Sequence, residues 1–322
     1  MGVQSSFGFT LGRMEKGKLN KITDVPGVRV GHVTRHEGGI NTGVTAILPH
    51  TGDIFHDKCP AASHVINGFG KSIGLVQVNE LGTIETPLLL TNTLSVGTAA
   101  TALVKYMLER NADIGCDTGT VNPMVFECND GHLNDIRGLH VTEQNALDAL
   151  ANAADDFEEG AVGAGSGMSC YSLKGGIGSA SRVFELYGNK YTVGALLLTN
   201  FGTLRDLTIG GERVGERLYQ KKEAEKAARK LPELTDGEVK ELQLTTQCYA
   251  FARVLDGKAC VVVLNNGDSP AQLEFQLPVE ASSAKDLLAD TVGAQPVLTS
   301  MEWGRMKVQL PSNYATILQL EK

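Results

Sequence analysis

Long apolar runs, closely paired cysteines and an excess of positive charge are all missing from this chain of 322 residues. No apolar run reaches the roughly 18 residues that a membrane-spanning helix needs. The six cysteines are scattered and form no CxxC pair, and no signal peptide is recognisable, so we expect reduced thiols and a cytoplasmic location. A formal net charge of −8 argues against general binding to nucleic acid or to anionic membranes.

Histidine and glycine are scarce in the last third of the chain. All seven histidines precede Val141, and most of the 37 glycines precede Leu231. The first part alternates strand-like segments, at 27–33, 43–49 and 86–92, with helical segments at 97–110 and after the capping residue Thr142. On the helix at 97–110 we expect Ala100, Val104 and Met107 or Leu108 to share one face. This alternation predicts layers of sheet packed against helix, and hence the α+β class.

The pattern changes to period two from about residue 234. Leu273 and Phe275 alternate with polar residues, and the dipeptides Asp256-Gly257 and Asn266-Gly267 predict hairpin turns. A charged segment at 212–230, which ends before Pro232, separates the two patterns. We therefore predict two domains, residues 1–232 and 233–322, of which the second is a small all-β unit.

Two glycine-rich strings resemble nucleotide-binding loops, but their spacing is wrong. Met168 stands where a dinucleotide fingerprint has its third glycine, and Val65 stands where a P-loop ending in Gly70-Lys71-Ser72 has its first. We interpret the glycines at 160–178 as positions where the chain takes positive φ and packs backbone against backbone.

An acidic string at 130–135 offers metal ligands. His132 with Asp130 or Asp135 has suitable side chains, but no second His or Cys pair stands at ligand spacing. Asp and Asn at such positions more often hold turns through hydrogen bonds to the backbone. We expect no metal and no cofactor.

A series of ordered strings in the first part carries a more specific signal. They are Ile22-Thr23-Asp24-Val25-Pro26-Gly27 with the residues up to 32, Thr42-Gly43-Val44-Thr45-Ala46, Thr91-Asn92-Thr93 with Ser95-Val96-Gly97, and the segments 129–136, 165–182 and 191–202. Together they resemble the DmpA-type family of L-aminopeptidase/D-esterases and β-peptidyl aminopeptidases. The resemblance implies an αββα sandwich related to the N-terminal-nucleophile hydrolases, usually a homo-oligomer. It also implies a precursor that cuts itself before a serine, which then attacks small peptides, amides or esters.

The resemblance also implies roles for individual residues. By position, Asn200 matches the family's oxyanion-binding asparagine, and Glu127 matches the glutamate that binds the substrate amine. A fixed amide donor suits an oxyanion, and a partly buried carboxylate suits a cationic amine. Asn129 stands where the family often has an aromatic residue at the substrate. The alternatives are a turn-forming role for Asn200 and a surface role for Glu127.

The resemblance does not extend to the nucleophile. The family needs Gly-Ser or Asn-Ser ahead of a β-branched strand, and neither dipeptide occurs after Gly202. Gly202-Thr203 lies too close to Asn200 to serve in place of this dipeptide. Gly165-Ser166 and Gly178-Ser179 lie within the glycine-rich segment. No residue is therefore assigned as nucleophile, and the sequence leaves open an active hydrolase or an inactive, fused scaffold.

The last part has a resemblance of its own. The strings Gly237-Glu238-Val239, Cys248-Tyr249-Ala250-Phe251, Val261-Val262-Val263-Leu264 and Asp286-Leu287-Leu288 resemble the C-terminal β-sandwich of cyclomaltodextrinase and neopullulanase-type α-amylases. The catalytic barrel of such enzymes is absent, so no glycosidase carboxylate pair is implied. Association with carbohydrate through this β-domain is the third, weaker hypothesis.

Overall fold

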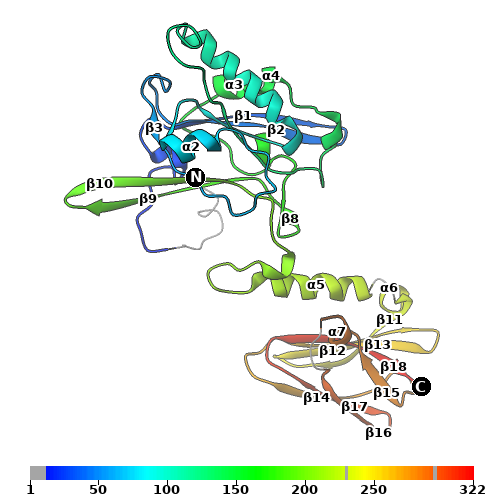
Figure 1. Ribbon diagram of the computed structural model, residues 1–322. Helices are drawn as coiled ribbons and strands as arrows, with labels where there is room; N and C mark the ends of the chain where they lie inside the picture. Colours follow the sequence, from blue (N-terminus) through cyan, green and yellow to red (C-terminus); the bar gives the residue numbers. More distant parts are fainter. Residues whose placement is uncertain (1–11, 229–230, 293–295) are drawn as a thin grey trace. The chain divides into compact units, whose positions relative to one another are not determined.

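The computed structural model describes residues 12–228, 231–292 and 296–322. The chain divides into two compact units, one up to Thr203 and one from Leu204 to Lys322 (Figure 1). The charged segment, which the sequence interpretation gave to the first domain, contains α5 (Val214–Ala228) and falls in the second unit. The domain limits 1–232 and 233–322 stay a prediction. Within the described ranges, none of the helices combines the length and the apolar character required to cross a bilayer.

A four-stranded mixed sheet forms the centre of the first unit, with the order β1-β2-β5-β6. β1 and β2 pair as an antiparallel hairpin whose turn contains Gly38 and Gly39, both at positive φ. β5 pairs antiparallel with β2, and β6 runs parallel to β5. The strands are β1 (Arg29–Glu37), β2 (Ile40–Leu48), β5 (Leu88–Thr91) and β6 (Met124–Glu127). The three strands predicted from the sequence are confirmed.

Two helices, α3 (Val96–Arg110) and α4 (Glu143–Ala151), cover one face of this sheet. The predicted cap of α4 is confirmed, because Thr142 Oγ1 accepts the Asn145 N–H. Ala100, Leu103 and Met107 of α3 are buried, whereas Leu108 is 46% exposed, so the core face continues through Met107. The predicted face is therefore confirmed at Ala100 and Met107, whereas the place expected for Val104, which is only half-buried, is taken by Leu103.

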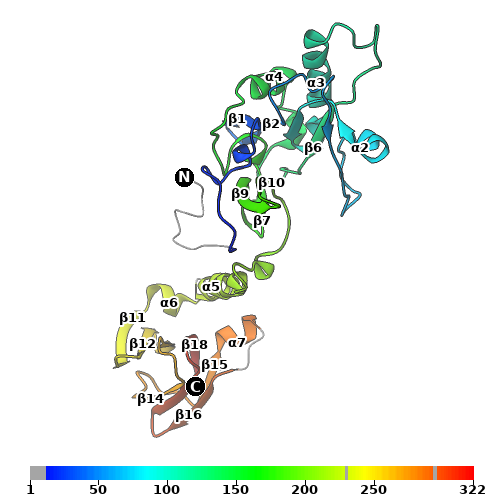
Figure 2. The ribbon, with the colours of Figure 1, turned by 90° about the vertical axis from the view of Figure 1, so that its left-hand side faces the viewer.

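A long hairpin covers the opposite face of the sheet. It consists of β9 (Ile177–Leu186) and β10 (Asn189–Leu198), which pair over their whole length. Its inner face joins a core cluster that contains Val30 of β1 and Leu90 of β5. The first unit thus has helices, a sheet and a hairpin as three successive layers (Figure 2).

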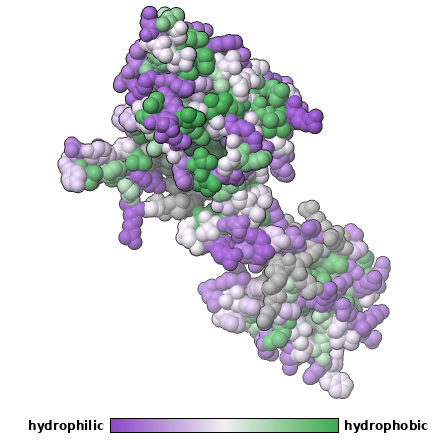
Figure 3. All heavy atoms as spheres, in the orientation of Figure 1, coloured by the Kyte–Doolittle hydropathy of each residue, from purple (hydrophilic) through white to green (hydrophobic). Residues whose placement is uncertain are grey.

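The outer face of this hairpin leaves apolar side chains in solvent. Tyr191, Val193 and Leu197 of β10 are 46%, 57% and 52% exposed. Because side chains alternate along a strand, these three residues share one face and stand opposite Phe184, Arg182 and Gly178 of β9. Apolar atoms also gather in the middle of the face of the first unit seen in Figure 3.

The smaller elements of the first unit surround this framework. They are η1 (Ile22–Asp24), β3 (Cys59–Pro60), α2 (Leu75–Leu81), β4 (Thr83–Ile84), η2 (Thr93–Ser95), η3 (Ile136–Gly138), η4 (Gly163–Gly165), β7 (Ser169–Cys170) and β8 (Leu173–Lys174).

The second unit contains two antiparallel sheets that share one core cluster. The five-stranded sheet has the order β11-β12-β13-β18-β15, and the three-stranded sheet has the order β14-β17-β16. The expected alternation is confirmed on β14, where Leu273 and Phe275 are buried between exposed neighbours. Its elements are η5 (Leu204–Asp206), α5, α6 (Pro232–Asp236), β11 (Glu238–Leu244), β12 (Cys248–Leu255), β13 (Lys258–Asn265), β14 (Ala271–Gln276), β15 (Ser283–Asp286), α7 (Leu287–Val292), β16 (Leu298–Glu302), β17 (Arg305–Leu310) and β18 (Tyr314–Glu321).

Of the two hairpin turns predicted in this unit, one is confirmed. Asp256 and Gly257, both at positive φ, connect the paired strands β12 and β13. The prediction for Asn266-Gly267 is wrong, because β13 and β14 belong to different sheets. The Gly267 N–H donates to Asn265 Oδ1, so this turn passes the chain from one sheet to the other.

Candidate functional site

Two segments far apart in the sequence meet where β6 and β10 end. Glu127 is the last residue of β6, and Asn200 follows two residues after β10. Asn200 Nδ2 donates a hydrogen bond to the backbone carbonyl of Asn129, across a separation of 71 residues. The structure therefore brings together Asn200 and Asn129, two of the three residues that the sequence singled out.

An open cavity of about 560 Å³ lies at this junction. Its lining consists of Asn129, His132, Ser169, Ser172, Asn200, Phe201 and Gly202. Glu127 does not belong to this lining. Its carboxylate accepts hydrogen bonds from Thr93 Oγ1 and, at 3.1 Å, from the Lys71 N–H. Glu127 is thus held at the end of β6, two residues before the cavity begins.

The hairpin formed by β7 and β8 provides one wall of the cavity. Its tip residues Tyr171 and Ser172 have φ of 52° and 56°, and the Tyr171 N–H donates to Phe201 O at 2.7 Å. Gly202 also has positive φ, and a Cβ there would lie 2.5 Å from the Tyr171 ring. A glycine is therefore required at position 202. The sequence interpretation missed this wall, for which Gly202 was the available signal.

A buried polar network supports the other wall. Thr42 Oγ1 donates to Asp130 Oδ2 at 2.7 Å and accepts from Asn92 Nδ2 at 2.8 Å. Asn134 Nδ2 donates to the second Asp130 oxygen at 3.0 Å. Burial raises the pKa of Asp130 above its usual value, against the effect of these hydrogen bonds. The network fixes the start of the loop that contains Asn129, whose carbonyl accepts the hydrogen bond from Asn200.

The acidic side chains of the segment 130–135 are therefore bonded to groups that hold their own loop. Asp130 is 1% exposed and bonded to Thr42 and Asn134, while Asp135 pairs with His140 at 3.0 Å. His132 lies in the cavity lining, apart from either pair. Over the described ranges, no group of three or more His, Cys, Asp or Glu side chains is arranged to hold a metal ion.

Three side chains with nucleophilic atoms, Cys128, Ser166 and Ser179, are protonated, buried or hydrogen-bonded within the fold. Burial, followed by the neighbouring Glu127, raises the pKa of the Cys128 thiol to about 12, so this thiol stays protonated at neutral pH. Ser166 is 4% exposed. Ser179 Oγ donates to Ala195 O and accepts the Ile22 N–H, both at 2.7 Å, which ties η1 to the hairpin. We assign none of them as nucleophile.

The glycine-rich segment packs against the first two strands. Gly163 has φ of 52°, and a Cβ there would lie 2.4 Å from Thr45 Oγ1. At Gly167 a Cβ would lie 2.1 Å from Asn41 O. Lys174 Nζ donates to three carbonyls of this segment, Gly165 O and Met168 O at 3.1 Å and Gly175 O at 2.8 Å. The prediction of backbone packed against backbone is confirmed.

The chain is similar to known proteins of one peptidase family. The model of Peptidase family S58 matches residues 20–292. The β-peptidyl aminopeptidase BapA of Sphingosinicella microcystinivorans is 41% identical over 215 residues, which is 64% of this chain and 53% of that protein. The chain therefore spans about half the length of the curated relatives that it matches.

Solved structures agree with this assignment. The PH0078 protein of Pyrococcus horikoshii is 57% identical with a TM-score of 0.66, over 67% of this chain and 64% of that one. The L-aminopeptidase D-Ala-esterase/amidase of Ochrobactrum anthropi, a variant of the Ntn-hydrolase fold, is 38% identical with a TM-score of 0.60, over 65% and 60%. Matches to debranching enzymes and α-amylases have TM-scores of 0.29 or lower, so the amylase resemblance stays a prediction. The chain belongs to Peptidase family S58.

Proposed function

We propose that the first unit forms the substrate site of a serine aminopeptidase, amidase or esterase that releases the amino-terminal residue of small peptides, amides or esters. The observation that carries the proposal is the cavity in which Asn200 meets Asn129, in a chain of family S58. Relatives named β-peptidyl aminopeptidase and L-aminopeptidase D-Ala-esterase/amidase support the same substrate class.

In this proposal Asn200 stabilises the oxyanion. An amide nitrogen carries two hydrogens, of which one is held by the Asn129 carbonyl. The second hydrogen is available to the oxyanion that forms when the substrate carbonyl is attacked. The Asn129 carbonyl thereby orients the amide before the substrate arrives.

Glu127 binds the substrate amine. Its carboxylate is fixed by Thr93 Oγ1 and the Lys71 N–H, so it loses little freedom when it pairs with a cation. A charged amine paired with a fixed carboxylate contributes about 1.5–3 kcal/mol, or roughly ten- to hundredfold in affinity. Asn129 completes the substrate contacts from the cavity wall.

The attack itself needs a hydroxyl that this chain does not supply at the family's position. No Gly-Ser or Asn-Ser dipeptide follows Gly202, and we propose no substitute. If the intact chain binds amines but hydrolyses no substrate, it is the scaffold of the alternative hypothesis. If it does hydrolyse a substrate, another residue of the chain acts as the nucleophile.

The proposal also includes the complete fold of each unit. The exposed apolar residues Tyr191, Val193 and Leu197 support a fourth layer on the outer face of the β9–β10 hairpin, which completes an αββα sandwich. The two sheets of the second unit, which share one core, support an all-β sandwich there. A homo-oligomer, as the family resemblance implies, is tested by light scattering on the purified chain.

The test combines intact mass, ligand binding and turnover. We expect β-alanine amide to bind the purified chain, and Glu127→Gln to weaken this binding about tenfold or more while Glu109→Gln leaves it unchanged. β-Alanyl-p-nitroanilide tests turnover, which Asn200→Ala lowers roughly 10²–10³-fold if it occurs. A single mass of 34.3 kDa without hydrolysis selects the scaffold alternative. Absence of both amine binding and hydrolysis overturns the proposal.

A further inference from the structure

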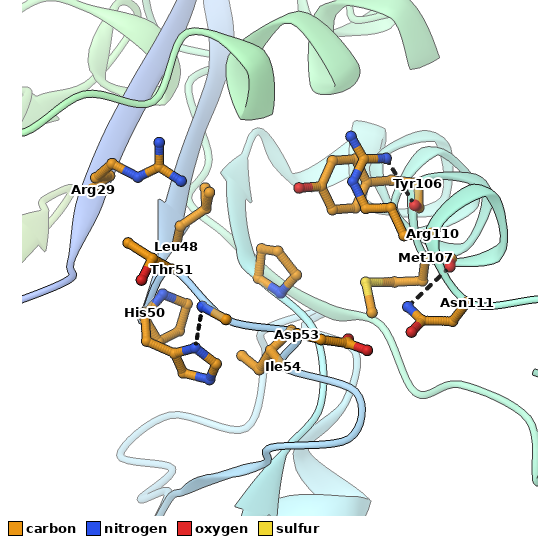
Figure 4. Close-up of a pocket in the computed structure, with 13 residues that line it drawn as sticks. Arg29, Leu48, His50, Thr51, Asp53, Ile54, Tyr106, Met107, Arg110 and Asn111 are labelled. Atoms are coloured by element: carbon orange, nitrogen blue, oxygen red, sulfur yellow. Dashed lines mark hydrogen bonds between the residues drawn. The ribbon is translucent and has the colours of Figure 1, made fainter.

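A second cavity lies in the first unit, at the other end of the central sheet from Asn200. It encloses about 340 Å³ and is lined by Arg29 at the start of β1, by the chain from Leu48 to Ile54 after β2, and by the last turn of α3. Pro87 of the lining precedes β5, whereas Glu127 is the last residue of β6 and Asn200 follows the end of β10. The cavity is therefore distinct from the site described above (Figure 4).

Arg29 enters this cavity with an unused donor. Its Nε is buried and has no hydrogen-bond partner among the described residues. Nor does its guanidinium form an ion pair with any carboxylate in the described ranges. Arg29 as a whole is half-buried, so the missing partner concerns this one donor. A buried donor without a partner costs about 1–3 kcal/mol, so it weakens the fold unless something else binds it.

The acidic and imidazole groups of the lining do not supply that partner. Asp53 Oδ1 accepts the Phe55 N–H at 3.1 Å, and Asp53 Oδ2 lies 2.6 Å from His56 Nδ1. His50 Nδ1 accepts the Gly52 N–H at 2.9 Å, and its Nε2 lies 3.0 Å from Asp57 O. Both side chains are thus committed to holding their own loop.

A second guanidinium lies across the cavity from Arg29. Figure 4 shows Arg110 beside Tyr106 and Met107, on the side of the cavity opposite Arg29 and Leu48. Arg110 lies 3.5 Å from the Tyr106 ring centroid and donates one hydrogen bond to Tyr106 O at 3.1 Å. The ring holds this guanidinium at the cavity, where it also forms an exposed ion pair with Glu109 at 3.8 Å. The pair is solvent-exposed and therefore weak, so a ligand can compete for the guanidinium.

Three apolar side chains contribute to the lining of the cavity. Leu48, Ile54 and Met107 are 8%, 6% and 2% exposed, and all three line the cavity. A cavity of this volume, lined by both apolar and polar side chains, is in the size range of small-molecule sites. We propose that this cavity binds a small organic carboxylate with an apolar body, whose carboxylate is held by Arg29 while Arg110 lies at the opposite side of the cavity. Guanidinium is the side chain best suited to hold a carboxylate through two parallel hydrogen bonds.

Benzoate is the probe that tests this assignment, and benzamide is its uncharged match. Isothermal titration or ligand-observed NMR on the full chain is expected to show saturable benzoate binding that is at least tenfold tighter than that of benzamide. Arg29→Met abolishes it, Arg110→Gln weakens it several-fold, and Arg35→Met, at a surface arginine paired with Glu37, leaves it unchanged. Equal binding of the two probes, or benzoate binding that survives Arg29→Met, overturns the proposal.

Stability provides a second readout. Because the Arg29 Nε has no partner in the free protein, Arg29→Met is expected to melt at the same temperature as the wild type or higher. A large fall in melting temperature would show that Arg29 serves the fold, and this result also overturns the assignment. Asn200→Ala leaves benzoate binding unchanged, so failure of the proposed hydrolase site and failure of this second site are distinguishable.

Discussion

Thr42→Val isolates the hydrogen bonds of one buried hydroxyl, because the two side chains have nearly the same shape. Thr42 is 1% exposed, and its hydroxyl connects Asp130 and Asn92, which are 1% and 2% exposed. In the variant, one carboxylate oxygen of Asp130 and the Asn92 amide each lose this partner while they stay buried. Each such loss costs about 1–3 kcal/mol, so the free energy of unfolding falls by about 2–6 kcal/mol. For a domain of this size the melting temperature falls by roughly 10 °C.

Thermal melts followed by circular dichroism measure this effect, with Thr101→Val as the matched control. Thr101 is exposed on α3 and bonds Gly97 O, so the control changes stability by less than about 0.5 kcal/mol. Loss of the Thr42 hydrogen bond raises the pKa of Asp130 further, because that bond favours the carboxylate. The loss in free energy of unfolding relative to the wild type is therefore largest at neutral pH, and it shrinks as the pH falls through the raised pKa of Asp130. A Thr42→Val variant within 1 kcal/mol of the wild type at pH 7 would refute this account of the network.

Further predictions concern the core, the thiols and an acidic pair. Leu103→Ala, at a fully buried position of α3, is expected to cost about 2–5 kcal/mol in urea unfolding, whereas Leu108→Ala costs less than about 1 kcal/mol. Cys116 is exposed and Cys128 has a thiol pKa of about 12, so a disulfide reagent at pH 8 modifies the first and leaves the second, as peptide mass mapping would show. Burial alone would raise the pKa of Glu85, but the hydrogen bonds from Lys58 and Asn122 outweigh it and lower that pKa. Its stabilising contribution is present above its unfolded pKa of about 4.3 and is lost as the pH falls through the lowered value, so Glu85→Gln weakens the fold at pH 7 more than at pH 3.

Much of the fold could be predicted because it follows from local patterns. The strands β1, β2 and β5 follow from the spacing of apolar residues, as do Ala100 and Met107 on the buried face of α3, where Leu103 is buried in place of the predicted Val104. The Thr142 cap follows from its hydroxyl at a helix start. The error at Asn266-Gly267 has the same origin. An Asn-Gly pair predicts a tight turn, but whether the flanking strands pair with each other depends on the rest of the sheet.

The candidate site could be predicted in part. The ordered strings drew attention to Glu127, Asn129 and Asn200, and their roles stay predictions. The wall formed by the β7–β8 hairpin was missed. Its tip residues Tyr171 and Ser172 have positive φ without being glycine and give no local signal, so that only Gly202, which packs against Tyr171, pointed to it.

By itself, the sequence determined the family, the α+β class and the absence of a Gly-Ser or Asn-Ser dipeptide after Gly202, because these depend on the order and spacing of residues along the chain. Only the tertiary structure decided which polar groups meet. Thr42 and Asp130 are 88 residues apart, and Asn129 and Asn200 are 71 apart. Such contacts arise when strands from distant segments are packed in one core, and no local pattern specifies them. The same packing leaves Arg29 Nε buried without a partner among the described residues, at a cavity that no local sequence pattern predicts.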